Sequence, residues 1–108
     1  MFNIPKETLE QLPDLYANEE IEAKDVKVPL KVFNPYGIGT WYITEYDAET
    51  GTAFGLCDLG FPELGYVNIK ELQSVSPVPA MPELGLEVDA HWNLDTSLAE
   101  VMSKVCHG

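Results

Sequence analysis

Two strand-like runs lie so close together in this chain that they restrict its fold to an antiparallel sheet. The runs are Thr40–Tyr46, which is rich in aromatic and β-branched residues, and Thr52–Asp58. The residues between them, 47–51, read Asp-Ala-Glu-Thr-Gly, a turn sequence that ends in glycine. We therefore predict a β-hairpin, with its two strands antiparallel.

Three more segments are predicted as strands. In Val26–Phe33 every second residue is apolar, which is the period of a half-buried strand. Pro29 lies inside this run and has no N–H to donate, so the strand is expected at an edge of the sheet. Gly65–Ile69 is predicted as the fourth strand and Glu87–Asn93 as a fifth.

Short helices are predicted at both ends of the chain. Residues 5–12 begin with proline in a first turn, and residues 70–73 form a helical turn. Asp95 or Thr96 is expected to cap a final helix with an apolar stripe. The sequence thus predicts one α+β domain over residues 1–108, an antiparallel four- to five-stranded meander sheet with short N-terminal and C-terminal helices.

Side-chain alternation sorts the sheet into two faces. Tyr42, Tyr46 and Tyr66 are expected on one face among small residues, where they form either a partner-binding platform or a surface covered by a terminal helix. Both arrangements stay open at this point. The opposite face is predicted to form the core, with Val28, Leu30, Val32, Trp41, Ile43, Phe54, Leu56, Val67 and Ile69.

The charge balance narrows the range of partners. The chain has 18 acidic residues, six lysines, no arginine and a formal net charge of −12. Arginine is the side chain best suited to forked recognition of phosphates, so this balance argues against direct binding to nucleic acid or anionic membrane. The alternative is that the acidity serves only solubility. The expected partner is a protein with a basic surface.

The chain shows no transmembrane run of roughly 20 apolar residues. Its N-terminal residues lack the basic start and apolar run of a secretory signal, so a cytoplasmic location is expected. Cys57 and Cys106 lie in dissimilar contexts, and we expect both thiols to stay reduced.

Metal and catalytic motifs are not evident. Cys57, His91, Cys106 and His107 are candidate ligands, but none of their spacings matches a structural zinc site. No serine lies in an elbow motif, and the glycines form no phosphate-binding loop. The sequence therefore predicts no metal, no cofactor and no catalytic residue, so the protein is expected not to be an enzyme.

Carboxylates near the strand ends are a separate candidate. Glu45, Asp47, Asp58 and Glu63 are expected near strand ends that a meander can bring together, with Glu49 in the hairpin turn. A pair that cleaves glycosides would need a deep aromatic cleft, which is hard to build in a chain of this length.

Three stretches resemble the domain of unknown function 2958 family, small proteins seen largely in plasmids, phages and other mobile elements. They are residues 12–20, 41–47 and 54–66, and the resemblance spans about residues 12–75. It implies no activity or site. Small acidic proteins of mobile elements often act as decoys that present carboxylates in place of phosphates, so the resemblance implies a setting of this kind.

Charge density sets a condition on the decoy hypothesis. A folded protein of this size exposes about 6,000 Å², so a net charge of −12 averages one charge per ~500 Å². Duplex DNA carries one per ~100 Å². The charges would match only if they gathered on one face.

The leading hypothesis is a non-enzymatic inhibitor of a host nucleic-acid-binding defence protein, such as a restriction or CRISPR nuclease. One alternative is an adaptor that binds a protein through apolar loops, around Phe61-Pro62 and residues 77–86. Another is an unrecognised small hydrolase with a concave pocket. In the leading hypothesis the partner contacts are the acids Glu45, Asp47, Glu49, Asp58 and Glu63 and the tyrosines Tyr42, Tyr46 and Tyr66.

Overall fold

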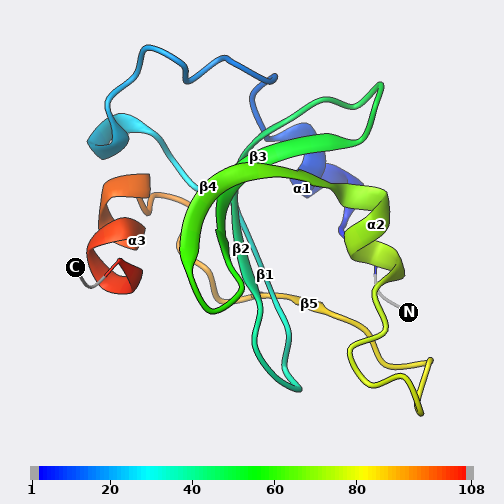
Figure 1. Cartoon of the computed structure of the whole chain (residues 1–108). Helices are drawn as coiled ribbons and strands as arrows, with labels where there is room; N and C mark the ends of the chain where they lie inside the picture. Colours follow the sequence, from blue (N-terminus) through cyan, green and yellow to red (C-terminus); the bar gives the residue numbers. More distant parts are fainter. Residues whose placement is uncertain (1–2, 107–108) are drawn as a thin grey trace.

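A computed structural model describes residues 3–106 and contains a five-stranded antiparallel sheet (Figure 1). The spatial order of the strands is β4-β3-β2-β1-β5, so the first four strands form a meander and the last joins beside β1. The predicted α+β meander is confirmed. The strands are β1 (Leu30–Phe33), β2 (Thr40–Tyr46), β3 (Thr52–Asp58), β4 (Pro62–Asn68) and β5 (Glu87–Val88). The helices are α1 (Lys6–Glu10), the 3-10 turn η1 (Ala23–Asp25), α2 (Ile69–Ser74) and α3 (Leu98–Val105).

Both faces of the sheet carry helices. Figure 1 shows α1 and α2 on one side of the sheet and α3 with η1 on the other. We call these the α1/α2 face and the α3 face. The core of the α1/α2 face contains Ile4, Leu12, Leu30, Val32, Trp41, Ile43, Ala53, Ile69, Leu72 and Leu86. The smaller core of the α3 face contains Val26, Val28, Tyr42, Leu56, Leu98 and Val101.

The β2–β3 hairpin has the strand bounds that the sequence predicts. The Asp47 carboxylate accepts hydrogen bonds from the Glu49 amide at 3.0 Å and from the Thr50 hydroxyl at 3.0 Å. Gly51 closes the turn with a φ of 80°, a conformation that glycine adopts without strain. Local turn chemistry therefore fixes this hairpin.

A β-bulge interrupts β2 between Ile43 and Glu45. Ile43 pairs with Gly55 and Glu45 pairs with Phe54, so Thr44 is the extra residue. A bulge of this kind shifts the alternation of side chains by one position. As a result Glu45 lies on the α3 face, and Tyr46 packs on the α1/α2 face.

The prediction that the first strand lies at an edge is wrong. β1 begins at Leu30, after Pro29, and lies between β2 and β5. Proline therefore precedes the ladder and removes no hydrogen bond from it. Val28 also lies outside the strand, where its amide donates to the Thr96 carbonyl at 2.9 Å, and its side chain belongs to the α3 face, not to the predicted core face.

Other bounds and faces differ from the predictions. β4 begins at Pro62 instead of Gly65, β5 ends at Val88, and Ser97 caps α3. Within β3 the predicted faces are reversed: Ala53 and Cys57 pack on the α1/α2 face, whereas Leu56 belongs to the α3 face. No helix in residues 3–106 is long and apolar enough to span a bilayer.

Candidate functional site: a groove on the α3 face

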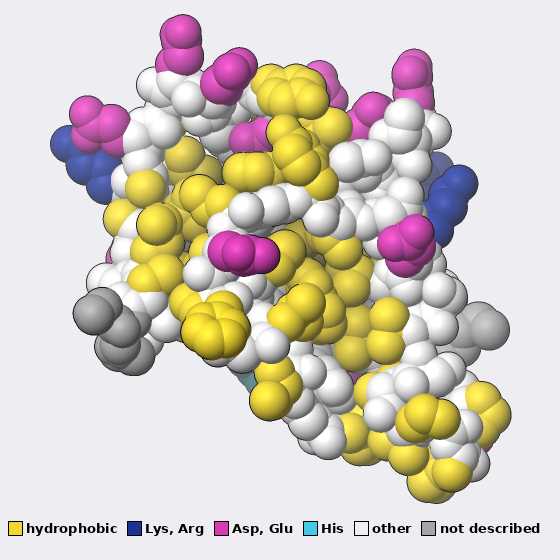
Figure 2. Space-filling model, in the orientation of Figure 1, with side chains coloured by type: hydrophobic (Ala, Val, Ile, Leu, Met, Phe, Trp, Pro, Cys, Tyr) yellow, Lys and Arg dark blue, Asp and Glu magenta, His cyan; other side chains and the backbone are white. Residues whose placement is uncertain are grey.

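A groove of about 410 Å³ opens on the α3 face. Its walls come from three parts of the chain: residues 16–21, the strands β2, β3 and β4, and the α3 helix with η1. Figure 2 shows hydrophobic side chains gathered across the middle of this view, with carboxylates around them and lysines only at its two edges. α3 covers one part of the sheet face and leaves the part beside β4 open.

The strand wall is aromatic and aliphatic. Phe54 and Tyr66 lie on paired positions of β3 and β4, and their ring centroids are 5.0 Å apart in an edge-to-face arrangement. Leu64 lies two residues before Tyr66, on the same face of β4. Tyr66 is 58% exposed and Leu64 46% exposed, so this wall presents apolar surface to solvent.

The facing walls are apolar as well. Residues 16–21 belong to the segment between α1 and η1 that crosses above the sheet, and Ile21 in this segment is 45% exposed. Leu98 and Met102 stand one turn apart on α3 and contribute the third wall. Ser97 fixes the start of that helix because its hydroxyl oxygen accepts a hydrogen bond from the Glu100 amide at 3.1 Å. The groove is thus a slot between apolar walls.

The bulged part of β2 places a carboxylate in this groove. Glu45 is 5% exposed and lines the groove beside Thr44. The Tyr16 amide donates a hydrogen bond to Glu45 Oε1, and the Thr44 hydroxyl donates to the Phe54 carbonyl at 3.1 Å. Charged groups are seldom buried this far without partners, so the bond from Tyr16 helps to hold Glu45 in place.

Residues 13–18, which cross above the sheet, are tied to β2 at the bulge and just after it. The Tyr46 amide donates to the Pro13 carbonyl at 2.9 Å, and the Asn18 amide group donates to the Thr44 carbonyl at 3.4 Å. Tyr16 has a φ of 69°, in the left-handed region that few non-glycine residues adopt. These contacts bring the Tyr16 side chain to the mouth of the groove.

The two tyrosines at the mouth are in contact. A side-chain hydrogen bond with Tyr16 raises the pKa of Tyr66. Slight burial and the negative charges of Glu45 and Glu19 raise this pKa further. The groove therefore has a negative potential at its aromatic end. Among the residues that the structure describes, no lysine lines it.

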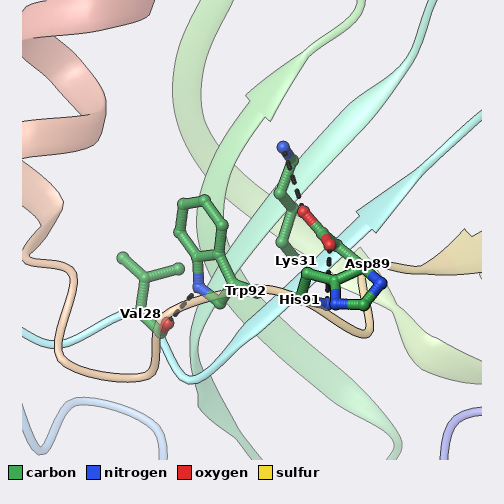
Figure 3. Close-up of polar contacts among 5 residues, drawn as sticks. All are labelled: Val28, Lys31, Asp89, His91 and Trp92. Atoms are coloured by element: carbon green, nitrogen blue, oxygen red, sulfur yellow. Dashed lines mark hydrogen bonds and ion pairs between the residues drawn. The ribbon is translucent and has the colours of Figure 1, made fainter.

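A lysine site elsewhere on the α3 face shows a related arrangement (Figure 3). Lys31 Nζ lies 3.5 Å from Asp89 Oδ2, 5.1 Å from the centroid of the Trp92 ring and 5.7 Å from that of the Tyr42 ring. Trp92 is held in turn by a 2.7 Å hydrogen bond from its indole nitrogen to the Val28 carbonyl. Here an ammonium group of the chain itself lies among aromatic rings and a carboxylate.

The predicted acidic residues do not form one cluster. Glu45, Asp47 and Glu49 lie at the hairpin end of the strands, whereas Asp58 and Glu63 flank the β3–β4 turn at the opposite end. Asp58 pairs with Thr40, five positions before Glu45 on β2, so roughly 16 Å of strand separates the two groups. The expectation that the meander brings these carboxylates together is wrong.

These acids also have different local roles. Asp47 and Asp58 accept backbone hydrogen bonds inside their own turns, with the Gly60 amide 3.2 Å from Asp58. Glu49 and Glu63 are exposed at the surface. Glu45 alone among the five lines the groove.

The three predicted contact tyrosines are separated as well. Tyr42 is 8% exposed because Trp92 and α3 cover it, and burial, with the nearby charges of Asp58 and Asp89, raises its pKa. Tyr46 lies on the α1/α2 face as a result of the bulge. Tyr66 is the member of the set that stays exposed on the α3 face, so there is no platform of three tyrosines.

The structure also places the candidate ligands and nucleophiles. Burial, and then the charge of Glu63, raises the pKa of the half-buried Cys57 thiol, which makes this thiol a weak nucleophile at neutral pH. His91 is exposed, and Cys106 is exposed after α3. His107 lies outside the described residues. Within residues 3–106, no three His, Cys, Asp or Glu side chains are grouped in a way that could hold a metal ion.

The fold and the groove define a class of protein: a small α+β protein with an antiparallel five-stranded sheet, one face of which is left partly open. The chain belongs to the family described as protein of unknown function DUF2958, which matches residues 4–106, nearly the whole chain. This agrees with the resemblance of the three sequence stretches. Comparisons with curated proteins and with solved structures gave no match.

Several groove residues were not singled out by their sequence pattern. Tyr16 lies in residues 15–20, which read as a connector, Ile21 follows them, and Met102 reads as part of the apolar stripe of the final helix. One local signal is present, because Thr44 and Glu45 are consecutive polar residues between the apolar Ile43 and the aromatic Tyr46. In the structure the β-bulge turns both of these side chains to the same face of the sheet.

Proposed function

We propose that this chain is a non-enzymatic interaction protein that binds a basic protein partner through the α3 face and the acidic turns around it. The observation that supports this most directly is the groove, which combines exposed apolar side chains with Glu45 and Glu19 in a chain of net charge −12. An exposed apolar surface with a polar rim is typical of protein interaction sites.

The more specific form of the proposal is an inhibitor. Its partner is a host nucleic-acid-binding defence protein, such as a restriction or CRISPR nuclease, and the carboxylates occupy positions meant for phosphates. The high net charge favours a partner with a basic channel. The separation of the acids into two groups favours two points of contact over a continuous imitation of duplex DNA.

Charge reversal tests the proposal. Glu49 and Glu63 are exposed, so Glu49→Lys combined with Glu63→Lys changes the acidic turns without removing a buried group. Glu7→Lys combined with Glu71→Lys makes the same change in net charge on exposed positions of α1 and α2, outside the two acidic turns. The tagged proteins are used to capture partners from a cell extract, which are then eluted with rising salt.

We expect the parent to retain a basic nucleic-acid-binding protein at low salt and to release it as salt screens the charges. The Glu49/Glu63 variant should lose that protein, and the Glu7/Glu71 variant should keep it. Retention that is unchanged in the Glu49/Glu63 variant would contradict the proposal.

A second candidate function is an adaptor that binds a protein through its apolar loops. Phe61, in the turn before β4, is 85% exposed, which is unusual for a phenylalanine. In that case Phe61→Ser would abolish capture, and elution would depend only weakly on salt.

A further inference from the structure

We infer that the groove on the α3 face is a receptor site for a single lysine or arginine side chain, flanked by an apolar residue, on a segment of the partner protein. This inference rests on the proposed function, since it names the part of a basic partner that the groove recognises.

The aromatic end of the groove has the composition of a cation site. Tyr16, Phe54 and Tyr66 line it together with the carboxylate of Glu45. Aromatic faces attract ammonium and guanidinium groups, and the attraction grows as water is excluded. A carboxylate that is 5% exposed adds a charge that salt screens poorly.

The Lys31 site on the same sheet face supports this assignment. There the chain places its own ammonium near the rings of Tyr42 and Trp92, with Asp89 as the counter-charge. The groove holds the same kinds of groups, aromatic rings and a carboxylate, and no lysine among the described residues lines it. The groove therefore has the receptor groups for a cation that the chain does not supply.

The shape of the groove indicates what accompanies the cation. A volume of about 410 Å³ exceeds the space that one lysine side chain fills and lies in the usual range of ligand pockets. Ile21, Leu64 and Met102 form apolar walls that suit an aliphatic neighbour of the cation. A free metal ion or a small inorganic cation would leave these walls exposed, so a protein segment is the better occupant.

Two short peptides separate charge from shape. One is acetyl-Leu-Lys-Leu-amide, and the other carries norleucine in place of lysine, which keeps the aliphatic carbons of the side chain and removes the ammonium group. Binding is followed by the NMR signals of the Met102 methyl group and the Tyr66 ring, which both line the groove. We expect the lysine peptide to shift both signals to saturation and to bind at least about tenfold more tightly than the norleucine peptide.

Variants identify the receptor groups. Glu45→Gln removes the charge but keeps an oxygen that can accept the hydrogen bond from the Tyr16 amide. This variant should weaken binding of the lysine peptide about fivefold or more. Tyr66→Leu removes an exposed ring and should weaken it about two- to fivefold, the range of an exposed cation–π contact. Glu71→Gln removes an exposed carboxylate of α2, on the other side of the sheet from the groove, and should change affinity less than about twofold.

Equal binding of the two peptides, no saturable shift with either peptide, or an unchanged affinity in Glu45→Gln would each overturn the inference. Its failure is distinguishable from failure of the proposed function. If the peptides do not bind but the Glu49/Glu63 reversal still abolishes partner capture, only the groove assignment is wrong. If the lysine peptide binds as expected while capture is insensitive to salt and to that reversal, the proposed function is wrong.

Discussion

The backbone amide of Tyr16 donates a hydrogen bond to the carboxylate of Glu45, and this bond joins residues 29 positions apart. It ties the segment above the sheet to the bulge in β2. The carboxylate is 5% exposed, and the amide lies in a partly buried contact. One interaction thus helps to position both the charged group and an aromatic wall of the groove.

Removal of this acceptor should destabilise the fold. Glu45→Ala leaves the Tyr16 amide without its partner, at a cost of about 1–3 kcal/mol in the free energy of unfolding. Glu45→Gln retains an acceptor oxygen and should stay within about 1 kcal/mol of the parent. Urea denaturation measures both values. Equal losses in the two variants would mean that the charge, and not the hydrogen bond, stabilises this contact.

Gly55 is required by the close approach of β2 and β3. A Cβ atom built at this position would lie 2.0 Å from the Tyr42 carbonyl oxygen and 2.9 Å from the Ile43 Cα atom. Gly55→Ala should therefore force the hairpin apart beside the bulge and cost about 2 kcal/mol or more.

The matched control is Gly65→Ala on the paired position of β4, where nothing lies within 4 Å of the added Cβ atom. We expect this variant to stay within about 0.5 kcal/mol of the parent. Thermal unfolding of the three proteins compares them, and similar losses at both glycines would argue against the close contact at Gly55.

The sequence predicts β2 and β3 to the residue because the turn between them has its own signature in Asp47 and Gly51. The faces of β3 could not be assigned in the same way. Ala53 and Cys57 are apolar, and so are Phe54 and Leu56, because the sheet is covered on both sides. Alternation of apolar and polar residues assigns side chains to the faces of a sheet only where one face is polar.

The groove was harder to predict than the sheet. It depends on the bulge at Thr44, which reverses the faces of Glu45 and Tyr46, and on a segment that meets β2 only in the folded chain. A single extra residue in a strand leaves little trace in hydrophobic periodicity. The sequence left open whether a helix covers the tyrosine face, and in the structure Tyr66 is exposed while Tyr42 is buried.

The cap of α3 should contribute measurably to stability. The Ser97 hydroxyl accepts the Glu100 amide, and its loss in Ser97→Ala should cost about 1 kcal/mol. Ser103 also lies in α3, where its exposed hydroxyl donates to the Glu100 carbonyl, so Ser103→Ala should change stability by less than about 0.5 kcal/mol. Urea denaturation compares the variants. A loss at Ser103 as large as that at Ser97 would contradict the assignment of the cap.

The two cysteines should differ in reactivity. The thiolate is the reactive form of cysteine, and burial raises the pKa of Cys57, so little of it is ionised at neutral pH. Cys106 is exposed and accessible to reagent. Iodoacetamide should therefore modify Cys106 well before Cys57, as measured by mass spectrometry of the intact protein and its peptides. Faster modification of Cys57 would indicate an environment that favours the thiolate.

The tyrosine pair at the mouth of the groove predicts a pH dependence at alkaline pH. The hydrogen bond to Tyr16 raises the pKa of Tyr66 above the ordinary value of 10.0. A group whose pKa is raised by folding holds its proton more tightly in the folded state. Its contribution to stability is therefore fully present below about pH 10 and is lost as the pH rises through the folded value.

Tyr16→Phe removes the partner hydroxyl and should lower the pKa of Tyr66 toward its ordinary value. Ionisation of Tyr66 can be followed by its ring signals in NMR spectra, with Tyr36→Phe as the control, because Tyr36 is exposed in the loop between β1 and β2. Tyr66 should ionise at a lower pH in the Tyr16→Phe variant than in the parent. In the Tyr36→Phe variant, Tyr66 should ionise at the same pH as in the parent. If Tyr66 titrates at the same pH in all three proteins, the two hydroxyls are not in contact, and the aromatic end of the groove is more open than the structure indicates.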